Sequence, residues 1–434
     1  MTSISAKRLI PEHLCARCGA CVPACPHGVL ALDAELFPYY ARESACTQCR
    51  CCLAVCPGVA VDFRAPAADR MVVHPLLGGY RDVWQACSRN AAVRDRASSG
   101  GAVTALLSEG LRAGALDAVL AVTMRPGDPT RAGYAVLTDP AEAERSGQAK
   151  YQIAHLAEVL PEIRRHDRVA VVGLPCHIHA LRKFEALEPD LGRRIAVRLG
   201  TFCNGVCERE GTLYLLRRLG VRPEDVRRLE YRRGPWPGVL WVEHDGGAPV
   251  AIRRDVYGAL LYLYLAERCL YCIDLTAEQA DLSFGDAKWA NARGEGRWSH
   301  LIVRTQRGEE FLNRVGSGLE LRSAAPADIV REQAYQFDFK KRRAFLRLRH
   351  RRPAPEYALA EAPAVSGGRL RETLFMLAYR SRRLARWILA AVPRAMLWEM
   401  SRRIFERIRR GRPPVSSGVS SPVGPAAPGG PASS

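Results

Sequence analysis

Apolar residues in the middle of the chain form short continuous runs, which alternate with segments whose apolar residues recur three and four positions apart. Continuous runs of this length are typical of buried strands, and they occur at 118–124, 168–174, 194–202, 280–286 and 301–305. Helical spacing occurs at 102–114, 177–187 and 211–219. Strands that alternate with helices predict an α/β fold with a mostly parallel, helix-covered sheet.

The N-terminal part carries a repeated cysteine pattern instead. The run C-x2-C-x2-C-x3-C-P occurs twice, 31 positions apart, and is typical of bacterial ferredoxins, in which the fourth cysteine of each run ligates the other cluster. This spacing predicts two 4Fe–4S clusters, one held by Cys15, Cys18, Cys21 and Cys56 and the other by Cys25, Cys46, Cys49 and Cys52. Zinc sites usually separate two C-x2-C pairs by a longer loop, so the duplicated run favours clusters.

Four later cysteines are candidates for a third cluster. Cys176 and Cys203 each follow a predicted strand, at the sheet edge where open α/β proteins bind ligands, and Cys269 and Cys272 form a C-x2-C pair. Spacing alone leaves open inert buried thiols, a redox-active dithiol at the C-x2-C pair, and zinc. Three cysteines remain. Cys51 is a spare beside a predicted ligand, Cys207 is an alternative to Cys203, and Cys87 has no evident partner.

Composition places the chain among globular proteins of a reducing compartment. The 434 residues are 48% hydrophobic and 25% charged, which is ordinary for a globular protein. Neither a signal peptide nor a spanning helix is expected from the apolar runs. Fifteen cysteines without an export signal favour metal ligation over disulfides and predict a cytoplasmic location.

The net charge of +19 is concentrated towards the C-terminal end, where residues 369–412 contain thirteen arginines and three glutamates. Leucine and isoleucine recur there at roughly helical spacing, and Pro393 is expected to break the run. This pattern predicts amphipathic helices on an anionic membrane surface; a helical hairpin packed on the protein, or a surface for an acidic partner, stays open. No aromatic stacking motif supports nucleic-acid binding.

A second chemical candidate is the junction Ser98–Gly101, directly before the helix predicted at 102–114. Glycines let a phosphate approach the backbone, and the helix N-terminus offers free amides. Plain capping of the helix by Ser98 or Ser99 is the alternative. No G-x-G-x-x-G follows a strand, so a Rossmann nicotinamide site is not supported.

Five stretches taken together resemble one protein family. They are SSGGAVTALL (98–107), AKYQIAHL (149–156), VVGLPCHIHALRK (171–183), LGTFCNGVC (199–207) and CLYCIDLTAEQADLSFGD (269–286). In this order they resemble the beta subunits of coenzyme F420 hydrogenases and dehydrogenases, whose relatives include 7-hydroxymethyl chlorophyll a reductase. The resemblance covers roughly residues 10–345, so the basic tail lies outside it.

The resemblance implies an iron–sulfur flavoprotein that binds FAD beside a 4Fe–4S cluster. The ligands of that third cluster would be Cys176, Cys203, Cys269 and Cys272. The flavin-side residues would be Ser98, Ser99, Gly100, Gly101, Thr104, Lys150, Tyr151, Gly173, Pro175 and Asp286. Lys150 would stabilise an anionic ring or bind phosphate, and a surface lysine is its alternative.

Two departures from the family pattern lie near the expected flavin. His177 follows Cys176 where the family usually has glutamine, and Lys288 intervenes between the Gly-Asp motif and Trp289. Both put a deazaflavin substrate in doubt. His177 and His179 are candidate proton donors because histidine titrates near neutral pH, although such histidines more often only pack or cap.

The chain is thus divided into five parts: a two-cluster ferredoxin-like module (1–65), a linker (66–80), an FAD-binding α/β domain (81–350), a basic amphipathic helical segment (351–412) and a disordered end (413–434). The predicted function is an oxidoreductase that passes electrons between 4Fe–4S clusters, FAD and an organic two-electron substrate, either coenzyme F420 or another small molecule. Its partner would be ferredoxin or an acidic subunit. The alternatives are an electron-transfer subunit without its own substrate site, and a redox-sensing module.

Overall fold

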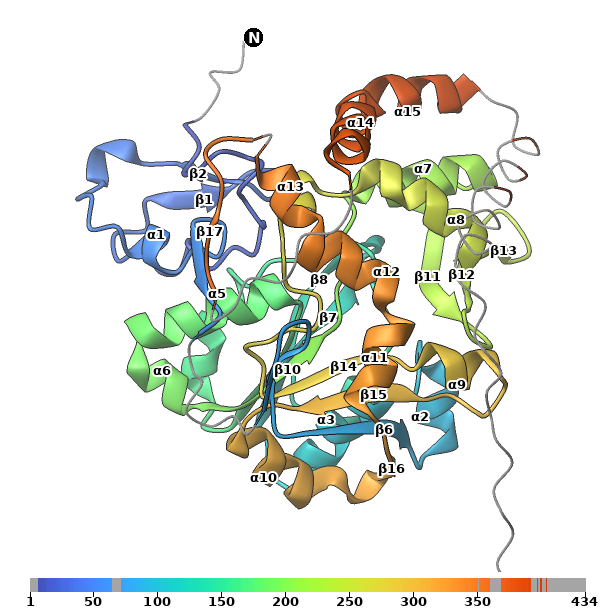
Figure 1. Ribbon diagram of the computed structural model, residues 1–434. Coiled ribbons are helices and arrows are strands. Elements are labelled where there is room, and N and C mark those ends of the chain that lie inside the picture. The colour runs from blue at the N-terminus through green and yellow to red at the C-terminus, as the bar shows by residue number, and fades with distance from the viewer. Residues whose placement is uncertain are drawn as a thin grey trace, which may run out of the picture.

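The computed structural model of the protein describes residues 7–64, 72–349, 351–359 and 368–391, together with the single residues 396, 399 and 403. The first part of the expected linker, the expected break at Pro393, most of the basic segment beyond 391 and the expected disordered end lie outside these residues. Figure 1 shows a central α/β domain, a small N-terminal module on one side and the helices α14 (Arg369–Arg380) and α15 (Arg382–Ala391) on top.

A mixed sheet of eight strands forms the centre of the molecule, in the spatial order β16-β6-β15-β14-β10-β9-β7-β8. In chain order these strands are β6 (Asp82–Ser88), β7 (Ala118–Arg125), β8 (Asp128–Leu137), β9 (Val169–Gly173), β10 (Ile195–Thr201), β14 (Leu282–Asp286), β15 (Ser299–Val303) and β16 (Leu319–Ser323). The five strands predicted from apolar runs are confirmed as β7, β9, β10, β14 and β15.

Only the middle of this sheet is parallel. Strands β7, β9, β10 and β14 run parallel to one another, whereas β8, β15, β6 and β16 are added by antiparallel pairs at the two edges. The α/β class is therefore confirmed, and the expectation of a mostly parallel sheet holds for the four central strands. These are the strands whose carboxyl ends carry Cys176 and Cys203.

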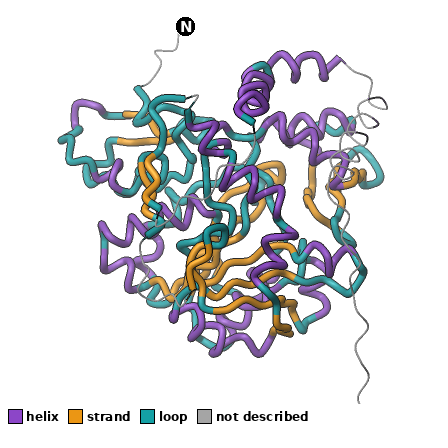
Figure 2. The backbone as a smooth tube through the Cα atoms, in the orientation of Figure 1, coloured by secondary structure: helices purple, strands orange, loops and turns teal. Residues whose placement is uncertain are grey.

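Side chains alternate between the two faces of the sheet, as they do on any strand. On β7, Val119 and Ala121 belong to the core formed with α3 (Ala102–Arg112) and α10 (Gln306–Val315). Ala118 and Leu120 belong to the opposite core, formed with α5 (Pro175–Leu187). The N-terminal module packs on this second face through Cys18 and other residues. Figure 2 shows helices on both faces of the sheet.

The remaining elements surround this sheet. The other described α-helices of the central domain are α2 (Ala91–Arg96), α4 (Pro140–Arg145), α6 (Pro189–Arg193), α7 (Arg209–Leu219), α8 (Arg254–Leu261), α9 (Lys288–Ala292) and α11 (Pro326–Glu332). A separate antiparallel sheet contains β11 (Val226–Arg233), β12 (Val239–His244) and β13 (Val250–Arg253). Tyr214 of α7 and Tyr257 of α8 share a core with it.

The N-terminal module contains β1 (Leu30–Leu32), β2 (Pro38–Tyr40), α1 (Cys51–Ala54) and β3 (Ala60–Asp62), and a short hairpin of β4 (Val72–His74) and β5 (Gly78–Tyr80) follows it. A C-terminal segment, here called the strap (residues 334–349 and 351–359), returns to this module. It contains α12 (Ala334–Phe337), a π-helix (Asp338–Arg342), α13 (Ala344–Leu348) and β17 (Glu356–Ala358). Strand β17 pairs with β3 in parallel, and His13 Nε2 lies 2.8 Å from the Pro353 carbonyl oxygen.

A buried ion triad fastens α14 to the strap. The fully buried Glu372 carboxylate binds Arg347 at 2.9 Å and also pairs with Arg343. On the same helix Met376 and Tyr379 are buried, and the Tyr379 hydroxyl donates to Leu265 O at 2.7 Å. The helix is therefore packed against the body by one face, as the hairpin alternative expected. No helix among the described residues is both long and apolar enough to cross a membrane.

Glu372→Gln is expected to lower the free energy of unfolding of the α14 region by about 3–5 kcal/mol, because two buried guanidinium groups lose their shared carboxylate. Hydrogen exchange of the α14 amides measures this loss. Glu224→Gln is the matched control, since Glu224 pairs with Arg222 at an exposed site and such pairs contribute roughly 0–1 kcal/mol. Equal protection of α14 in both variants would contradict the expectation.

Candidate functional site

The eight cysteines of the duplicated C-x2-C-x2-C-x3-C-P run are described in two groups. We call Cys15, Cys18, Cys21 and Cys56 the inner group. All four are buried, and burial raises the pKa of Cys21 well above its usual value, with further rises from Cys18, Cys15 and Cys56. The backbone turns tightly to bring these thiols together: Arg17 and Gly19 have positive φ, and Arg17 N–H donates to Cys15 Sγ at 3.3 Å.

The outer group contains Cys25, Cys46, Cys49 and Cys52. Cys49 is exposed and the other three are half-buried. Burial raises the pKa of Cys52, and Cys25 and Cys49 add to the rise. Cys25 of the first run thus lies with the second run, and Cys56 of the second run lies with the first. The structure brings together the two sets that spacing predicted, and their role as cluster ligands stays a prediction.

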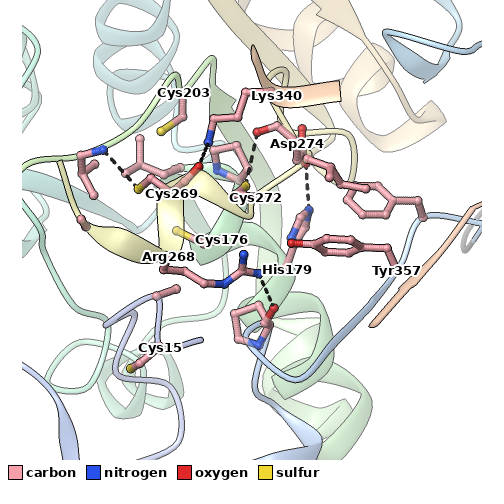
Figure 3. A pocket seen from close by; sticks show the side chains of 18 residues that line it. Cys15, Cys176, His179, Cys203, Arg268, Cys269, Cys272, Asp274, Lys340 and Tyr357 are labelled. Carbon is pink, nitrogen blue, oxygen red and sulfur yellow. Dashed lines mark hydrogen bonds and ion pairs between the residues drawn. The ribbon is translucent and has the colours of Figure 1, made fainter. Parts of the chain in front are cut away.

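The four later cysteines line one cavity, which Figure 3 shows from close by. Cys176 is in the first turn of α5, directly after β9, and Cys203 follows β10. Because β9 and β10 are parallel neighbours, their carboxyl ends place both thiols at one edge of the sheet. Cys269 and Cys272 reach the same cavity from a short 3-10 segment, Glu267–Leu270, and the residue after it. We call these four the third group.

This cavity suits a metal cluster better than a single ion. Its volume is about 40 Å³, several times the roughly 10–15 Å³ that one water molecule needs on the same measure. No three Cys, His, Asp or Glu side chains of the described chain lie close enough to hold one metal ion. Four thiols around one cavity are the number that a cubane needs, and the third cluster, the zinc site and the dithiol all stay predictions.

Buried thiolates also need positive charge nearby. Burial raises the pKa of Cys203 to about 12, whereas Lys340 acts in the opposite direction. Lys340 is itself buried, and its Nζ donates to Cys269 O at 3.3 Å. Val206 N–H approaches Cys269 Sγ at 3.5 Å. The donor set therefore fits a negatively charged cluster.

The inner group has neighbours in both of the other groups. Cys52 of the outer group contributes to the pKa of Cys21 in the inner group. Cys18 of the inner group contributes to the pKa of Cys176 in the third group, and Cys15 lines the same cavity as Cys176. The inner group therefore lies between the outer group, which includes the exposed Cys49, and the cavity of the third group.

The leftover cysteines lie outside the third group. Cys207, the alternative to Cys203, donates its thiol to Leu261 O at 3.3 Å and packs with the core of the small sheet. Cys87 is buried beside Trp298. Cys51 lies next to Cys49, and the hydrogen bond from the Cys51 backbone N–H is the main cause that lowers the pKa of the Cys49 thiol.

The Ser98–Gly101 junction forms a helix N-terminus without a side-chain cap. Gly101, with φ of 73°, is the residue that precedes α3. Ser98 Oγ accepts from Ala149 N–H at 2.8 Å, and Ser99 Oγ donates to Trp298 O at 2.6 Å. A Cβ at Gly100 would overlap the Ala86 carbonyl oxygen. Both hydroxyls therefore fix the turn rather than cap the helix, and the first amides of α3 stay available for an anion.

Lys150 lies on the turn that faces this helix. Its Nζ donates to Gly147 O at 2.7 Å and Gln148 O at 3.1 Å, and also to Ser146 O. Burial lowers the pKa of Lys150 to about 7. Thr104 of α3 lies against Gly147. Lys150 thus orders the loop beside the α3 N-terminus, and the surface-lysine alternative does not describe it.

Tyr151 is held between two side chains at the edge of the small sheet. Arg254 Nε donates to its hydroxyl at 3.3 Å, and the Tyr231 ring packs edge-on with centroids 5.5 Å apart. Asp286, at the end of β14, binds Arg232 at 2.9 Å and accepts from Trp236 Nε1 at 3.3 Å. These residues bring the small sheet and the main sheet together.

His177 is fully engaged inside the protein. Its Nδ1 lies 2.8 Å from the Tyr134 hydroxyl, its Nε2 lies 3.0 Å from Ala154 O, and burial lowers its pKa to about 4. Gly173 allows this packing, because a Cβ there would meet His177 Cβ at 2.9 Å. Pro175 begins α5 and also lines the cavity of the third group. The geometry favours packing over proton donation for His177.

The second candidate proton donor, His179, and the residues of the second departure, Lys288 and Trp289, are also engaged. His179 Nε2 lies 2.8 Å from Asp274 Oδ2 at the cavity. Lys288 Nζ donates to Glu332 O at 3.2 Å, and Arg331 lies over the Trp289 ring at 5.5 Å.

Sequence reasoning missed Lys340, Arg268 and Tyr357, which line the cavity of the third group with the cysteines. Arg268 is adjacent to Cys269, which is a signal that spacing arguments could have used. Lys340 and Tyr357 come from the strap, more than sixty positions away, and no motif connects them with the cysteines.

Comparisons with known proteins agree with this architecture. The family "Coenzyme F420 hydrogenase/dehydrogenase, beta subunit" matches with its N-terminal domain at residues 83–161 and with its C-terminal domain at residues 166–328, and residues 14–60 match a "4Fe-4S dicluster domain". The chain is similar to the beta subunit of coenzyme F420 hydrogenase from Methanococcus voltae, with 28% identity over 55% of this chain and 82% of that protein.

Two further similarities cover more of the chain. The F subunit of F(420)H(2) dehydrogenase from Methanosarcina mazei is 24% identical over 72% of this chain and 85% of its own length. A chain of the F420-reducing [NiFe] hydrogenase complex from Methanosarcina barkeri has the same fold, with a TM-score of 0.52 and 22% identity over 68% of this chain and 99% of that chain. The protein therefore belongs to the coenzyme F420 hydrogenase/dehydrogenase beta-subunit family of oxidoreductases and carries a 4Fe–4S dicluster domain.

Proposed function

We propose that this protein is a cytoplasmic iron–sulfur flavoprotein that moves electrons between a partner at its N-terminal module and an organic two-electron substrate at FAD. The observation that carries the proposal is that the inner group of cysteines adjoins both other groups: Cys52 of the outer group acts on Cys21, and Cys15 lines the cavity of the third group. Bound clusters would carry single electrons, and FAD would exchange them for the electron pair of the substrate.

The polypeptide would divide this work among its parts. The ferredoxin-like module (1–65) would hold two clusters, and the α/β domain (81–350) would hold the third cluster and FAD. The outer group includes the exposed Cys49, where a partner can approach it, while the half-buried thiols of the third group line a cavity at the sheet edge. Partial burial of this kind helps to keep the transferred electrons away from solvent and dissolved oxygen.

The α3 N-terminus is the proposed anchor for the FAD phosphates. Its first amides have no side-chain cap, and Lys150 orders the neighbouring turn. Tyr151 and Asp286 fix the adjoining edges of the two sheets. We propose that His177 holds β9 and α5 in place rather than acting as an acid.

The substrate is proposed to be coenzyme F420 or another planar organic molecule, by analogy with the names of the relatives. Ferredoxin or a partner enzyme subunit would donate or accept the electrons. The second candidate is an electron-transfer subunit without a substrate site, since relatives are named as subunits. Rapid oxidation of reduced coenzyme F420 by the isolated chain would favour the first candidate.

Chemical analysis of anaerobically purified protein tests the cofactor assignment. We expect about twelve irons, a similar amount of acid-labile sulfide and about one FAD per chain, because three groups of four thiolates suit three 4Fe–4S clusters. About eight irons without flavin would overturn the assignment of the central domain. The chain would then be a two-cluster electron carrier or redox sensor.

Lys150→Met is expected to weaken FAD binding by about tenfold, since each hydrogen bond that orders the loop beside α3 contributes roughly 0.5–1.5 kcal/mol and about 1.4 kcal/mol is a factor of ten. Fluorescence titration of deflavinated protein with FAD measures the change. Lys7→Met serves as the control because Lys7 is exposed on the N-terminal module. Equal FAD affinity in the Lys150 variant and the wild type would remove Lys150 from the proposed site.

We also infer that the basic segment contacts a membrane peripherally. One face of α14 is packed, while large apolar side chains elsewhere on α14 and α15 are exposed: Leu370, Leu374, Leu377, Leu384 and Ile388. Exposed arginines accompany them at 369, 371 and 380. Apolar residues between arginines are typical of helices that lie on anionic lipid.

A further inference from the structure

Arg268 lies between the inner group and the third group of cysteines. Its side chain is 93% buried, with an exposed fraction of 7%. The Arg268 charge contributes to the pKa values of Cys18 and Cys56 on one side. Cys272 and Cys176 act on Arg268 from the other side. Figure 3 shows the guanidinium group between Cys176 and the loop that carries Cys15.

The hydrogen bonds of this guanidinium group are incomplete within the protein. Nη2 donates to Pro57 O at 3.1 Å, which ties the segment before Cys269 to the turn after Cys56. Nε and Nη1 are buried and make no hydrogen bond of good geometry among the described residues. Against the lowering effect of burial, the neighbouring Tyr357, whose ring centroid lies 5.9 Å from Cζ, raises the pKa of Arg268 through its charge and its hydroxyl. No carboxylate of the described chain forms an ion pair with Arg268. Buried donors without acceptors are unfavourable, so these N–H groups point to acceptors that the polypeptide does not supply.

Two lysines allow a comparison, because each lies beside only one group. Lys183 Nζ donates to Cys56 O at 3.2 Å, on the side of the inner group. Lys340 lines the cavity of the third group. Among these three cations, Arg268 alone adjoins both groups. Arg268 can therefore interact with both groups, whereas each lysine can interact with one.

We propose that Arg268 is a shared charge-compensating residue, whose guanidinium N–H groups donate to sulfur atoms of the inner and third clusters and stabilise the reduced state of both. The inference rests on the proposed cluster assignment. Reduction of either cluster is the gain of one electron, with no bond made or broken, and adds one negative charge to a site without bulk water. A fixed cation and N–H···S hydrogen bonds favour that state.

The test is a redox titration of the full-length protein followed by electron paramagnetic resonance. Arg268→Met is expected to lower the midpoint potentials of the inner and third clusters together and to leave that of the outer cluster unchanged. Arg268→Lys keeps the charge and is expected to restore part of both potentials. Lys183→Met is expected to lower only the inner potential. Iron content, measured on each sample, shows that the compared proteins hold the same clusters.

Unchanged potentials in Arg268→Met at full iron content would overturn the proposal, as would an equal shift of all three clusters. If Arg268→Met does not retain iron, Arg268→Lys decides: a shift of both potentials supports the shared role, and a shift of only one contradicts it. About eight irons in the wild type would instead refute the third cluster of the proposed function. The inner potential would then still report whether Arg268 acts on that cluster.

Discussion

Replacing Cys269 and Cys272 together with alanine is expected to lower the iron content by about four atoms per chain, because two of the four ligands of one 4Fe–4S cluster are removed. The inner and outer groups do not include these residues and should keep about eight irons. Both cysteines line the cavity that also contains Cys176 and Cys203. Iron and sulfide analysis, together with the visible absorption of the clusters, measures the loss.

Cys207→Ala is the matched control for this double variant. Cys207 is another buried cysteine of the same domain, but its thiol binds Leu261 O and it does not line the cavity. Its substitution should leave the iron content unchanged. Full iron in the double variant, or a similar loss in Cys207→Ala, would contradict a cluster at the third group.

The N-terminal groups were accessible from the sequence because all of their information is local. Within one C-x2-C-x2-C run, the thiols are only a few residues apart, so chain connectivity alone keeps them together. The repeat also predicts that Cys25 of the first run joins the second group and that Cys56 of the second run joins the first. The third group needed one more argument, that parallel strands end at the same sheet edge, and this brought Cys176 and Cys203 together correctly.

Other features could not be predicted because they depend on contacts between distant segments. The strap places Lys340 beside Cys203 and pairs β17 with β3, and nothing in its spacing indicates either contact. The edge strand β8 mixes polar and apolar residues (DPTRAGYAVL) and gave no strand signal. Ser98 and Ser99 were expected to cap or bind phosphate, but tertiary neighbours engage both hydroxyls.

The two faces of α14 bear on two interpretations that the sequence left open. A packed hairpin and a membrane-binding helix need the same amphipathic pattern, so the pattern cannot distinguish them. The structure assigns Glu372, Met376 and Tyr379 to the packed face and leaves leucines on the other. Packing on the protein is therefore compatible with a second, outward contact.

Leu374→Glu combined with Leu377→Glu is expected to weaken binding to vesicles rich in phosphatidylglycerol by more than tenfold. Both leucines are more than half exposed, and transfer of each leucine from water into the lipid boundary contributes about 1.5–3 kcal/mol. Co-sedimentation measures the bound fraction. Wild-type binding should also fall with added salt, because the arginines attract the anionic headgroups through screened charges.

Leu321→Glu is the control for this last variant, since Leu321 is exposed on β16 and far in sequence from α14. It should bind vesicles as the wild type does. Equal binding to uncharged phosphatidylcholine would show that the arginines take no part. Failure of the wild type to bind anionic vesicles would assign the exposed leucines to a protein partner, because an apolar surface of this kind on a folded chain is expected to be covered by something.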